Sequence, residues 1–219
     1  HSKYNTNVPI LLNAALVLTL EEWTGETHFV VDQENFGRQF GNIDISRTVG
    51  WLTVMYPLEL RGAYKTIKEL IIGVKEQMRT IPNHGIGYGV LKYNNNLFHK
   101  DTREQSEIRL NYLGQFDKDF NNDLFSYVHR SSGNDSDPEN LMTSKLEIIA
   151  FVMEGRIMID FSYNMKAHKV STIQYIKNRF ADRLVEILRH IKEDADYHIT
   201  LADFGMVGLD DAELDLLFE

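Results

Sequence analysis

The segment from Ile10 to Leu20 constrains the fold most strongly, because its apolar side chains leave almost no polar face for water. Only Asn13 and Thr19 interrupt it, and as a helix it would be apolar in nearly every direction. Such a helix must be buried, so the rest of the chain has to form layers that cover it. The segment is too short to cross a bilayer and lacks the basic flank of a signal peptide, so no membrane is expected as a partner.

Local signals mark the ends of this helix and the strands that follow it. Asn7 is suited to cap the helix, Pro9 fits its first turn, and Gly25 is suited to end it. Pro57 predicts that the second strand is an edge strand or contains a bulge. Glu154-Gly155 predicts a hairpin turn between the last two strands. Alternating or β-rich runs predict strands at 27–32, 53–60, 107–116, 145–153 and 156–163.

Helical spacing of apolar residues predicts two further helices. One runs from about Tyr64 to Arg79 and is stopped by 82–85; the other runs to about Lys192 and is opened by a capping box of Ser171 and Gln174. The order helix, strands, helix, strands, helix indicates an α/β layered sandwich in which helices flank a mixed β-sheet. Residues 131–140 are expected to form a polar loop, and the acidic tail at 203–219 is typical of a linker to another domain.

Composition excludes several classes of function. The net charge is −9, and 23 Lys and Arg among 32 Asp and Glu form no basic stripe, which argues against nucleic acid as a partner. The chain has no cysteine, which excludes disulfides, thiolate metal sites and a cysteine nucleophile and is compatible with a reducing cytoplasm. The eight histidines show neither HExxH nor a pair at helical spacing, so no metal site is expected.

Three segments carry glycine or polar residues where plain core elements would not. The first, Pro82 to Gly89, has three glycines at alternate positions. No strand precedes it and no Lys-Ser/Thr follows it, so we interpret it as a tight turn that permits close packing rather than as a phosphate-binding loop. His84 is the only histidine in so distinctive a segment.

The second segment, Glu34-Asn-Phe-Gly-Arg38, follows the first predicted strand. Glu34 and Arg38 could form an ion pair, or Glu34 could project into a cleft as an acid/base; the residues alone favour the ion pair. Residues 47–51 lead into the next strand. Trp51 is interpreted there as a core residue rather than one that stacks on a ligand.

The third segment, Arg109 to Asp117, alternates like a strand but is interrupted by polar residues and by Gly114. Alternation places Asn111 and Tyr112 on opposite faces, so both can reach one cleft only if a bulge near Gly114 re-aims one of them. Tyr112 could equally be a core tyrosine. By themselves these residues indicate a cleft protein with one candidate acid/base and no complete catalytic set.

Taken together and in this order, the segments resemble the signature motifs of epimerization domains of nonribosomal peptide synthetases, in the condensation-domain superfamily. The resemblance covers about Tyr4 to Asp196 and rests on 7–18, 34–38, RTVGWLTVMYP at 47–57, GIGYG at 85–89 and NYLGQFD at 111–117. It implies a chloramphenicol-acetyltransferase-like lobe. The family has two such lobes facing each other across a tunnel, and its N-terminal lobe carries an HHxxxDG motif that this chain lacks. Residues 1–196 therefore resemble the C-terminal lobe alone, and 197–219 the connector to a following domain.

The resemblance implies a reaction in antibiotic biosynthesis: inversion of L to D at the α-carbon of an aminoacyl or peptidyl thioester. No cofactor would be bound directly, because the substrate is carried on the 4′-phosphopantetheine of a peptidyl carrier protein domain. Glu34 and Tyr112 would be catalytic, Glu34 opposite the second histidine of the missing lobe and Tyr112 as an oxyanion donor or proton relay. The missing N-terminal lobe and adjacent synthetase domains are the other implied partners. The residues implied to line the tunnel are Arg38, Trp51, His84, Tyr88 and Asn111.

One motif departs from the family. Its usual Glu-Gly-His-Gly-Arg-Glu is replaced here by residues 34–39, Glu-Asn-Phe-Gly-Arg-Gln, which removes two polar groups beside the site. Two alternatives therefore stay open: a condensation-type lobe that forms amide bonds between carrier-bound acyl groups, and a non-catalytic platform on which carrier proteins dock. As half of an epimerase, the lobe alone is expected to be inactive.

Overall fold

The apolar N-terminal segment forms a buried helix, as its composition predicts. A computed structural model of the chain describes residues 2–38, 43–94, 106–116, 133, 137, 140 and 142–204. Helix α1 (Val8–Thr24) is capped by Asn7, whose side-chain oxygen accepts a hydrogen bond from the Ile10 N–H at 3.1 Å. It ends at Gly25, which adopts the left-handed conformation. Both predicted ends are confirmed.

Five strands in the described ranges form one mixed sheet in the order β2-β1-β3-β4-β5. The inner neighbours β1, β3 and β4 run parallel, and the outer strands β2 and β5 pair antiparallel to β1 and β4. Pro57 therefore lies on an edge strand of the described sheet, a position where proline is tolerated. The strands are β1 (His28–Asn35), β2 (Val54–Arg61), β3 (Ile108–Gln115), β4 (Leu146–Met153) and β5 (Arg156–Tyr163).

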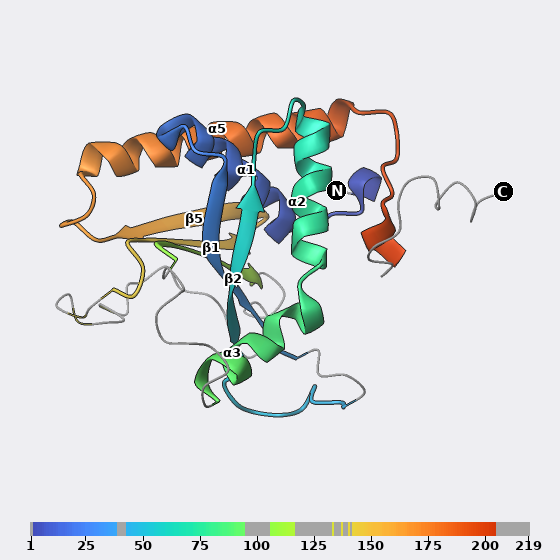
Figure 1. Ribbon diagram of the computed structural model, residues 1–219. Helices are drawn as coiled ribbons and strands as arrows, with labels where there is room; N and C mark the ends of the chain where they lie inside the picture. Colours follow the sequence, from blue (N-terminus) through green and yellow to red (C-terminus); the bar gives the residue numbers. More distant parts are fainter. Residues whose placement is uncertain are drawn as a thin grey trace.

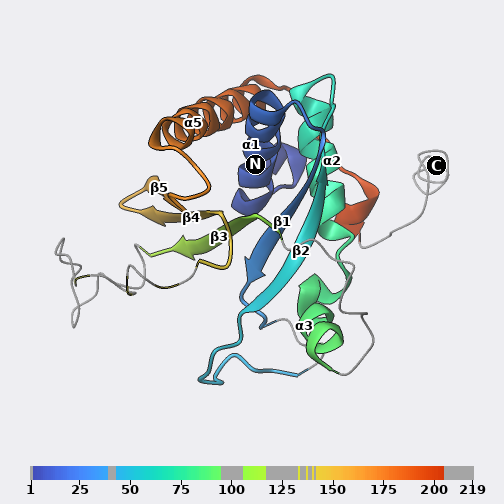
Figure 2. The ribbon, with the colours of Figure 1, turned by 60° about the vertical axis from the view of Figure 1, so that its left-hand side comes forward.

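Helices α1, α2 (Ile67–Arg79) and α5 (Val170–Glu193) cover one face of this sheet (Figures 1 and 2). Alternate strand residues such as Leu58, Val31, Leu110 and Ile148 point into the layer between sheet and helices and are buried there. Helix α1 packs between α5 and α2. The predicted α/β sandwich with a mixed sheet flanked by helices is therefore correct.

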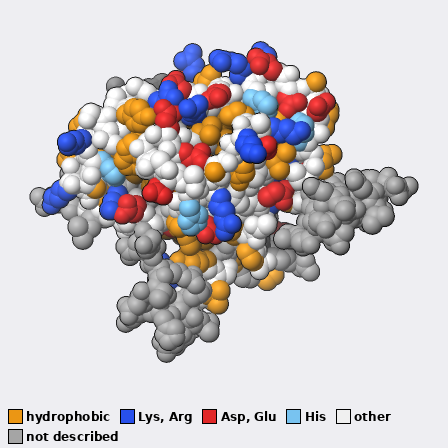
Figure 3. Space-filling model, turned by 45° about the horizontal axis from the view of Figure 1, so that its top comes forward, with side chains coloured by type: hydrophobic (Ala, Val, Ile, Leu, Met, Phe, Trp, Pro, Cys, Tyr) orange, Lys and Arg blue, Asp and Glu red, His pale blue; other side chains and the backbone are white. Residues whose placement is uncertain are grey.

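The outer surface of the helical layer is charged. Lys and Arg side chains lie next to Asp and Glu side chains across it (Figure 3). Glu22 of α1 joins two helices there, because its carboxylate is paired with Arg179 and Arg183 of α5, each at 2.8 Å. Among the described helices, none is long and apolar enough to cross a membrane.

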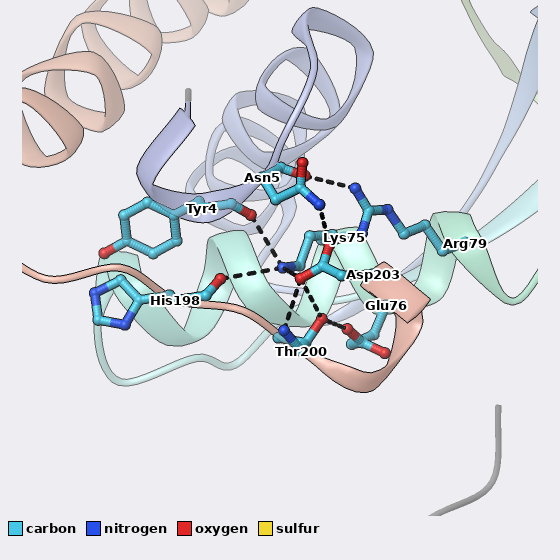
Figure 4. A network of polar contacts seen from close by, with 8 residues as sticks. All are labelled: Tyr4, Asn5, Lys75, Glu76, Arg79, His198, Thr200 and Asp203. Carbon is cyan, nitrogen blue, oxygen red and sulfur yellow. Dashed lines mark hydrogen bonds and ion pairs between the residues drawn. The ribbon is translucent and has the colours of Figure 1, made fainter. Parts of the chain in front are cut away.

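A polar network fastens the segment after α5 to α2 (Figure 4). Lys75 of α2 lies 2.9 Å from the carboxylate of Asp203 in the short helix η3 (Leu201–Phe204), and it also donates to the Tyr4 carbonyl at 3.0 Å. Arg79 pairs with the same carboxylate. Asp203, which composition assigned to a linker, is therefore packed against the lobe; the rest of that predicted linker, 205–219, lies outside the described residues.

The glycine-marked segment at 82–89 is not one tight turn. It forms a short helix η2 (Pro82–Gly85) followed by α3 (Ile86–Tyr93), so Gly87 and Gly89 lie inside a helix. Gly85 is the position that needs glycine: its φ is +84°, and a Cβ atom there would overlap the ring of Tyr56. The alternate spacing of the glycines concealed this helix.

The capping box predicted for the last helix is also absent. Helix α5 begins at Val170, its N-cap is Lys169, and no side chain caps it. Ser171 lies inside the helix, and Gln174 instead donates to the side chain of Asn178 at 2.9 Å. The apolar stripe predicted for this helix is buried except at one position: Leu188, which was predicted to be buried with the others, is 47% exposed. The residues of the stripe that face the core are Ile173, Ile176, Phe180, Leu184, Ile187 and Ile191. Of the predicted polar loop, only 133, 137 and 140 are described.

Candidate active site

Strand pairing brings a row of polar side chains together on the sheet face opposite the helices. Asp32 of β1 is paired with Arg109 of β3, and Arg109 with Glu147 of β4. Because every second strand residue faces the same side, Glu34 and Asn111 extend this row by one position. The contact between them confirms the placement: the Asn111 Nδ2 donates to the Glu34 Oε2 at 2.7 Å.

Glu34 occupies a poorly solvated position in this row. Its side chain is 15% exposed, and its Oε1 lies 3.7 Å from the Nη1 of Arg109. Burial raises the pKa of Glu34 above its ordinary value; Arg109 opposes this rise, while the carboxylates of Glu147 and Asp32 add to it. A carboxyl group whose pKa is raised by burial beside a specific charged partner is a candidate for acid/base chemistry.

Arg38 does not pair with Glu34. Its Nη1 donates to the backbone carbonyls of Ile45 (3.0 Å) and Thr48 (3.1 Å), so it closes the loop that leads toward β2. The ion pair favoured from the sequence is therefore wrong, because the residue beside Glu34 is fixed by strand pairing rather than by closeness in sequence. Arg109 takes the position expected of Arg38.

Asn111 and Tyr112 lie on opposite faces of β3. Tyr112 packs against the hydrophobic core on the helical side of the sheet, and burial raises the pKa of its hydroxyl. The bulge predicted near Gly114 is present, since the pairing with β4 shifts between Tyr112 and Gln115 and Gly114 has a φ of +95°. It begins after Tyr112, however, and leaves the alternation of these two residues intact.

A pocket of about 290 Å³ opens at the end of β1, immediately after Glu34. His84 reaches it from η2 and Arg38 from the loop after β1, so the structure brings these two predicted residues together. Gly37 forms the tight loop beneath it: its φ is +61°, and a Cβ atom would overlap the carbonyl oxygen of Leu52. The pocket is lined by Asn35, Phe36, Gly37, Arg38, His84 and Ile86.

The other three predicted tunnel residues, Asn111, Trp51 and Tyr88, are not among those that line this pocket. Trp51 precedes β2 and is 90% exposed, so its interpretation as a core residue is wrong. Val49, in the same segment before β2, is likewise 99% exposed, so this segment is not packed into the described core. Tyr88 lies on α3, packs partly against the core, and has the Nζ of Lys92 5.6 Å from its ring centre.

Sequence reasoning missed three charged residues of the site, Asp32, Arg109 and Glu147. The alternation of the Arg109–Asp117 segment already placed Arg109 on the same face as Asn111. What it could not supply is the order of the strands, which sets Glu147 on one side of Arg109 and Glu34 on the other. Over the ranges described, no group of three or more His, Asp or Glu side chains could hold a metal ion.

The family is decided by a comparison with known protein families. The condensation domain family matches residues 1–206, which is nearly the whole chain and contains all of the site. This chain belongs to the condensation domain family.

Relatives of this condensation domain are large synthases. Surfactin synthase subunit 2 of Bacillus subtilis (strain 168) is 33% identical over 225 residues, which is 100% of this chain and 6% of that protein. Tyrocidine synthase 1 of Brevibacillus parabrevis is 33% identical over 231 residues, 99% of this chain and 21% of that protein. The chain thus spans a small part of each relative.

Solved structures support the same assignment. The epimerization domain from the third module of tyrocidine synthetase B has a TM-score of 0.79 and 28% identity, over 89% of this chain and 44% of that chain. The first condensation domain of the CDA synthetase has a TM-score of 0.53 and 18% identity, over 89% of this chain and 40% of that chain. The second likeness concerns the fold alone.

Proposed function

We propose that this condensation-family chain is the C-terminal lobe of an epimerization domain in a nonribosomal peptide synthetase. Its reaction would invert L to D at the α-carbon of an aminoacyl or peptidyl thioester held on a carrier protein's 4′-phosphopantetheine. The observation that carries the proposal is the Glu34–Asn111 pair, in which a largely buried carboxylate accepts a hydrogen bond from an amide donor at 2.7 Å. The pair lies beside a pocket at the end of the same strand.

The chemistry requires two proton-transferring groups on opposite faces of the α-carbon. One removes the α-proton, so that the C–H bond breaks and its electron pair enters an enolate of the thioester. The other returns a proton to the opposite face of that carbon. In this proposal Glu34 is one of the two groups, and Asn111 keeps its carboxylate aimed in one direction. The second group comes from the N-terminal lobe.

Two comparisons favour an epimerization domain over an amide-forming condensation domain. Identity and TM-score are both higher for the tyrocidine synthetase epimerization domain (28% and 0.79) than for the CDA condensation domain (18% and 0.53). The chain covers 44% of the epimerization domain, which supports its assignment as one of two lobes. The proposal is built on Glu34 alone, because the Tyr112 ring packs on the other face of the sheet; a role for its hydroxyl stays a prediction.

The test uses the chain joined to its N-terminal lobe, with a carrier protein loaded with an L-aminoacyl thioester. Exchange of the α-proton is followed in deuterated water. Glu34→Gln keeps the size and hydrogen-bonding capacity of the side chain but cannot accept the proton, so exchange should fall by about 10²-fold or more. Glu59→Gln, the same change at an exposed position on β2, is the matched control and should leave the rate unaltered.

The possible outcomes separate the competing functions. Exchange that survives Glu34→Gln at the normal rate would refute the proposed role of Glu34. Amide formation without exchange would identify a condensation-type lobe, and carrier binding without either reaction would identify a docking platform. A comparable rate from the 219-residue chain alone would contradict the two-lobe requirement.

A further inference from the structure

The guanidinium of Arg109 lies between two carboxylates from different strands. Its Nη1 donates to the Glu147 Oε1 at 3.2 Å and lies 3.7 Å from the Glu34 Oε1. Its Nη2 donates to the Thr143 Oγ1 at 2.7 Å. Arg109 is thus hydrogen-bonded to Glu147. Glu34 interacts with the charge of Arg109 at a longer distance, and its own hydrogen bond comes from Asn111.

The charges on this sheet face do not balance. Strand β1 contributes Asp32 and Glu34, and β4 contributes Glu147, but β3 contributes only the cation Arg109. On β2 the residue paired with Glu34 is Met55, which has no charge. Among the described groups of β1, β3 and β4, three carboxylates therefore lie around a single guanidinium. If the guanidinium moves closer to one of them, its attraction to the other two becomes weaker.

Two further charges lie farther out. Lys92 of α3 favours the ionised form of Asp32. Asp160 lies on β5, where it is paired with Ile149 of β4, so β4 separates it from β3. The side chains of Glu34, Arg109 and Glu147 are 15%, 16% and 25% exposed, so solvent screens the charges among them only in part. Neutralising one of these three side chains should therefore change the electrostatic interactions of the other two.

We infer that Arg109 is a positioning residue for Glu34, and that Glu147 competes with Glu34 for it and so sets the pH range in which Glu34 is an anion. The role of Glu34 as a proton-transferring group rests on the proposed function; the competition for Arg109 does not. The directions of the interactions agree: Arg109 lowers the pKa of Glu34, while Glu147 raises it. The two residues should consequently have opposite effects when each is neutralised.

The experiment compares Arg109→Gln and Glu147→Gln in the full chain. The titration of the Glu34 carboxyl is followed by ¹³C NMR and assigned by its absence in Glu34→Gln. Loss of Arg109 should move the midpoint up by roughly one pH unit or more, because an opposite charge at 4–6 Å favours ionisation. Loss of Glu147 should move it down, since a like charge disappears and Arg109 is freed. Glu59→Gln is the control for a distant charge change and should not shift it.

The pH profile of α-proton exchange in the two-lobe protein gives an independent readout. Its acidic midpoint should move in the same opposite directions in the two variants. Arg109→Lys, which retains the charge, should keep the midpoint close to that of the wild type. Shifts in the same direction, or none beyond that of Glu59→Gln, would overturn the inference. If exchange does not depend on Glu34, the proposed function fails, but the NMR titration still decides whether Glu34 and Glu147 compete.

Discussion

The ammonium of Lys75 lies 2.9 Å from the carboxylate of Asp203, and the two side chains are only 0% and 3% exposed. This pair joins the middle of α2 to a residue 128 positions later in the chain. Without Asp203, Lys75 would be a buried charge whose remaining partners are the carbonyls of Tyr4 and His198.

Replacing Asp203 should therefore destabilise the lobe strongly. Removal of one partner of a buried ion pair costs about 3–5 kcal/mol, so Asp203→Ala should lower the free energy of unfolding by about that amount. Urea denaturation of the full chain measures it. Asp196→Ala removes an exposed carboxylate from the same segment and should change the free energy by less than about 0.5 kcal/mol. Equal effects of the two changes would show that the buried Lys75–Asp203 pair adds no more to the free energy of unfolding than an exposed carboxylate does.

A second prediction concerns the amide pair of Asn13 and Gln33, which is buried between α1 and β1. Each side chain donates to the other's oxygen at 3.0 Å. Asn13→Ala or Gln33→Ala alone leaves the partner's amide buried and unsatisfied, which should cost about 1–3 kcal/mol. The double change to Asn13→Leu and Gln33→Met should cost less than the sum of the two single alanine changes. Additive losses in a double-mutant cycle would show that the amides do not act as a pair.

The features that could be predicted are those set by local chemistry. The cap at Asn7, the stop at Gly25 and the edge position of Pro57 each depend on one residue's own hydrogen bonds or dihedral angles. The burial of α1 follows from its apolar surface alone. Even so, a local signal can mislead, as Ser171 did: the N-cap of the helix is Lys169, two residues before Ser171.

The candidate site could be predicted only in part. Glu34 and Asn111 were identified, but their contact and the position of Arg109 depend on which strands are neighbours, and the order β2-β1-β3-β4-β5 is not the order along the chain. Arg38 was expected beside Glu34 because it is four residues away. The loop at 43–48 instead takes up its hydrogen bonds.

A third prediction separates the glycines of the 82–89 segment. Gly85→Ala should destabilise the chain by about 1–3 kcal/mol, because its φ is +84° and the added Cβ meets Tyr56. Gly87→Ala is the matched control, since Gly87 lies in α3 with open space at its Cβ position. That change should stabilise the chain by about 0.5–1 kcal/mol, as alanine does in a helix. Thermal unfolding of both variants measures the difference, and destabilisation by both would contradict the α3 assignment.

A fourth prediction concerns Glu22, which connects α1 to α5. Hydrogen bonds from Arg179 and Arg183 lower its pKa from 4.5 to about 2. Because the folded state holds the proton less tightly than the unfolded state, this contribution is present above pH 4.5 and is lost as pH falls toward 2. Glu22→Gln should lower the free energy of unfolding at pH 7 by about 1 kcal/mol, a modest value for a partly exposed network. The difference between wild type and variant should shrink below pH 4.5; a constant difference would exclude the ionised carboxylate as its cause.

The last prediction concerns the pH dependence of the proposed exchange. Burial raises the pKa of Glu34 above 4.5, so its base form should be lost as pH falls through a midpoint higher than 4.5. Asn111→Ala removes the donor that holds the carboxylate and favours its ionised form, which should move this midpoint further up. On the acidic side of the profile the rate should fall roughly tenfold, as expected for a lost hydrogen bond to a charged group.

Tyr112→Phe provides the contrast for Asn111→Ala, because Tyr112 is the next residue of β3 but lies on the other face. Loss of its hydroxyl should leave the acidic midpoint unchanged, since its ring packs against the core rather than beside Glu34. A large loss of rate at every pH in Tyr112→Phe would instead indicate that the hydroxyl donates to the enolate oxygen. That result would require the strand to rearrange when the thioester binds. A midpoint at or below 4.5 in the wild type would contradict the raised pKa of Glu34.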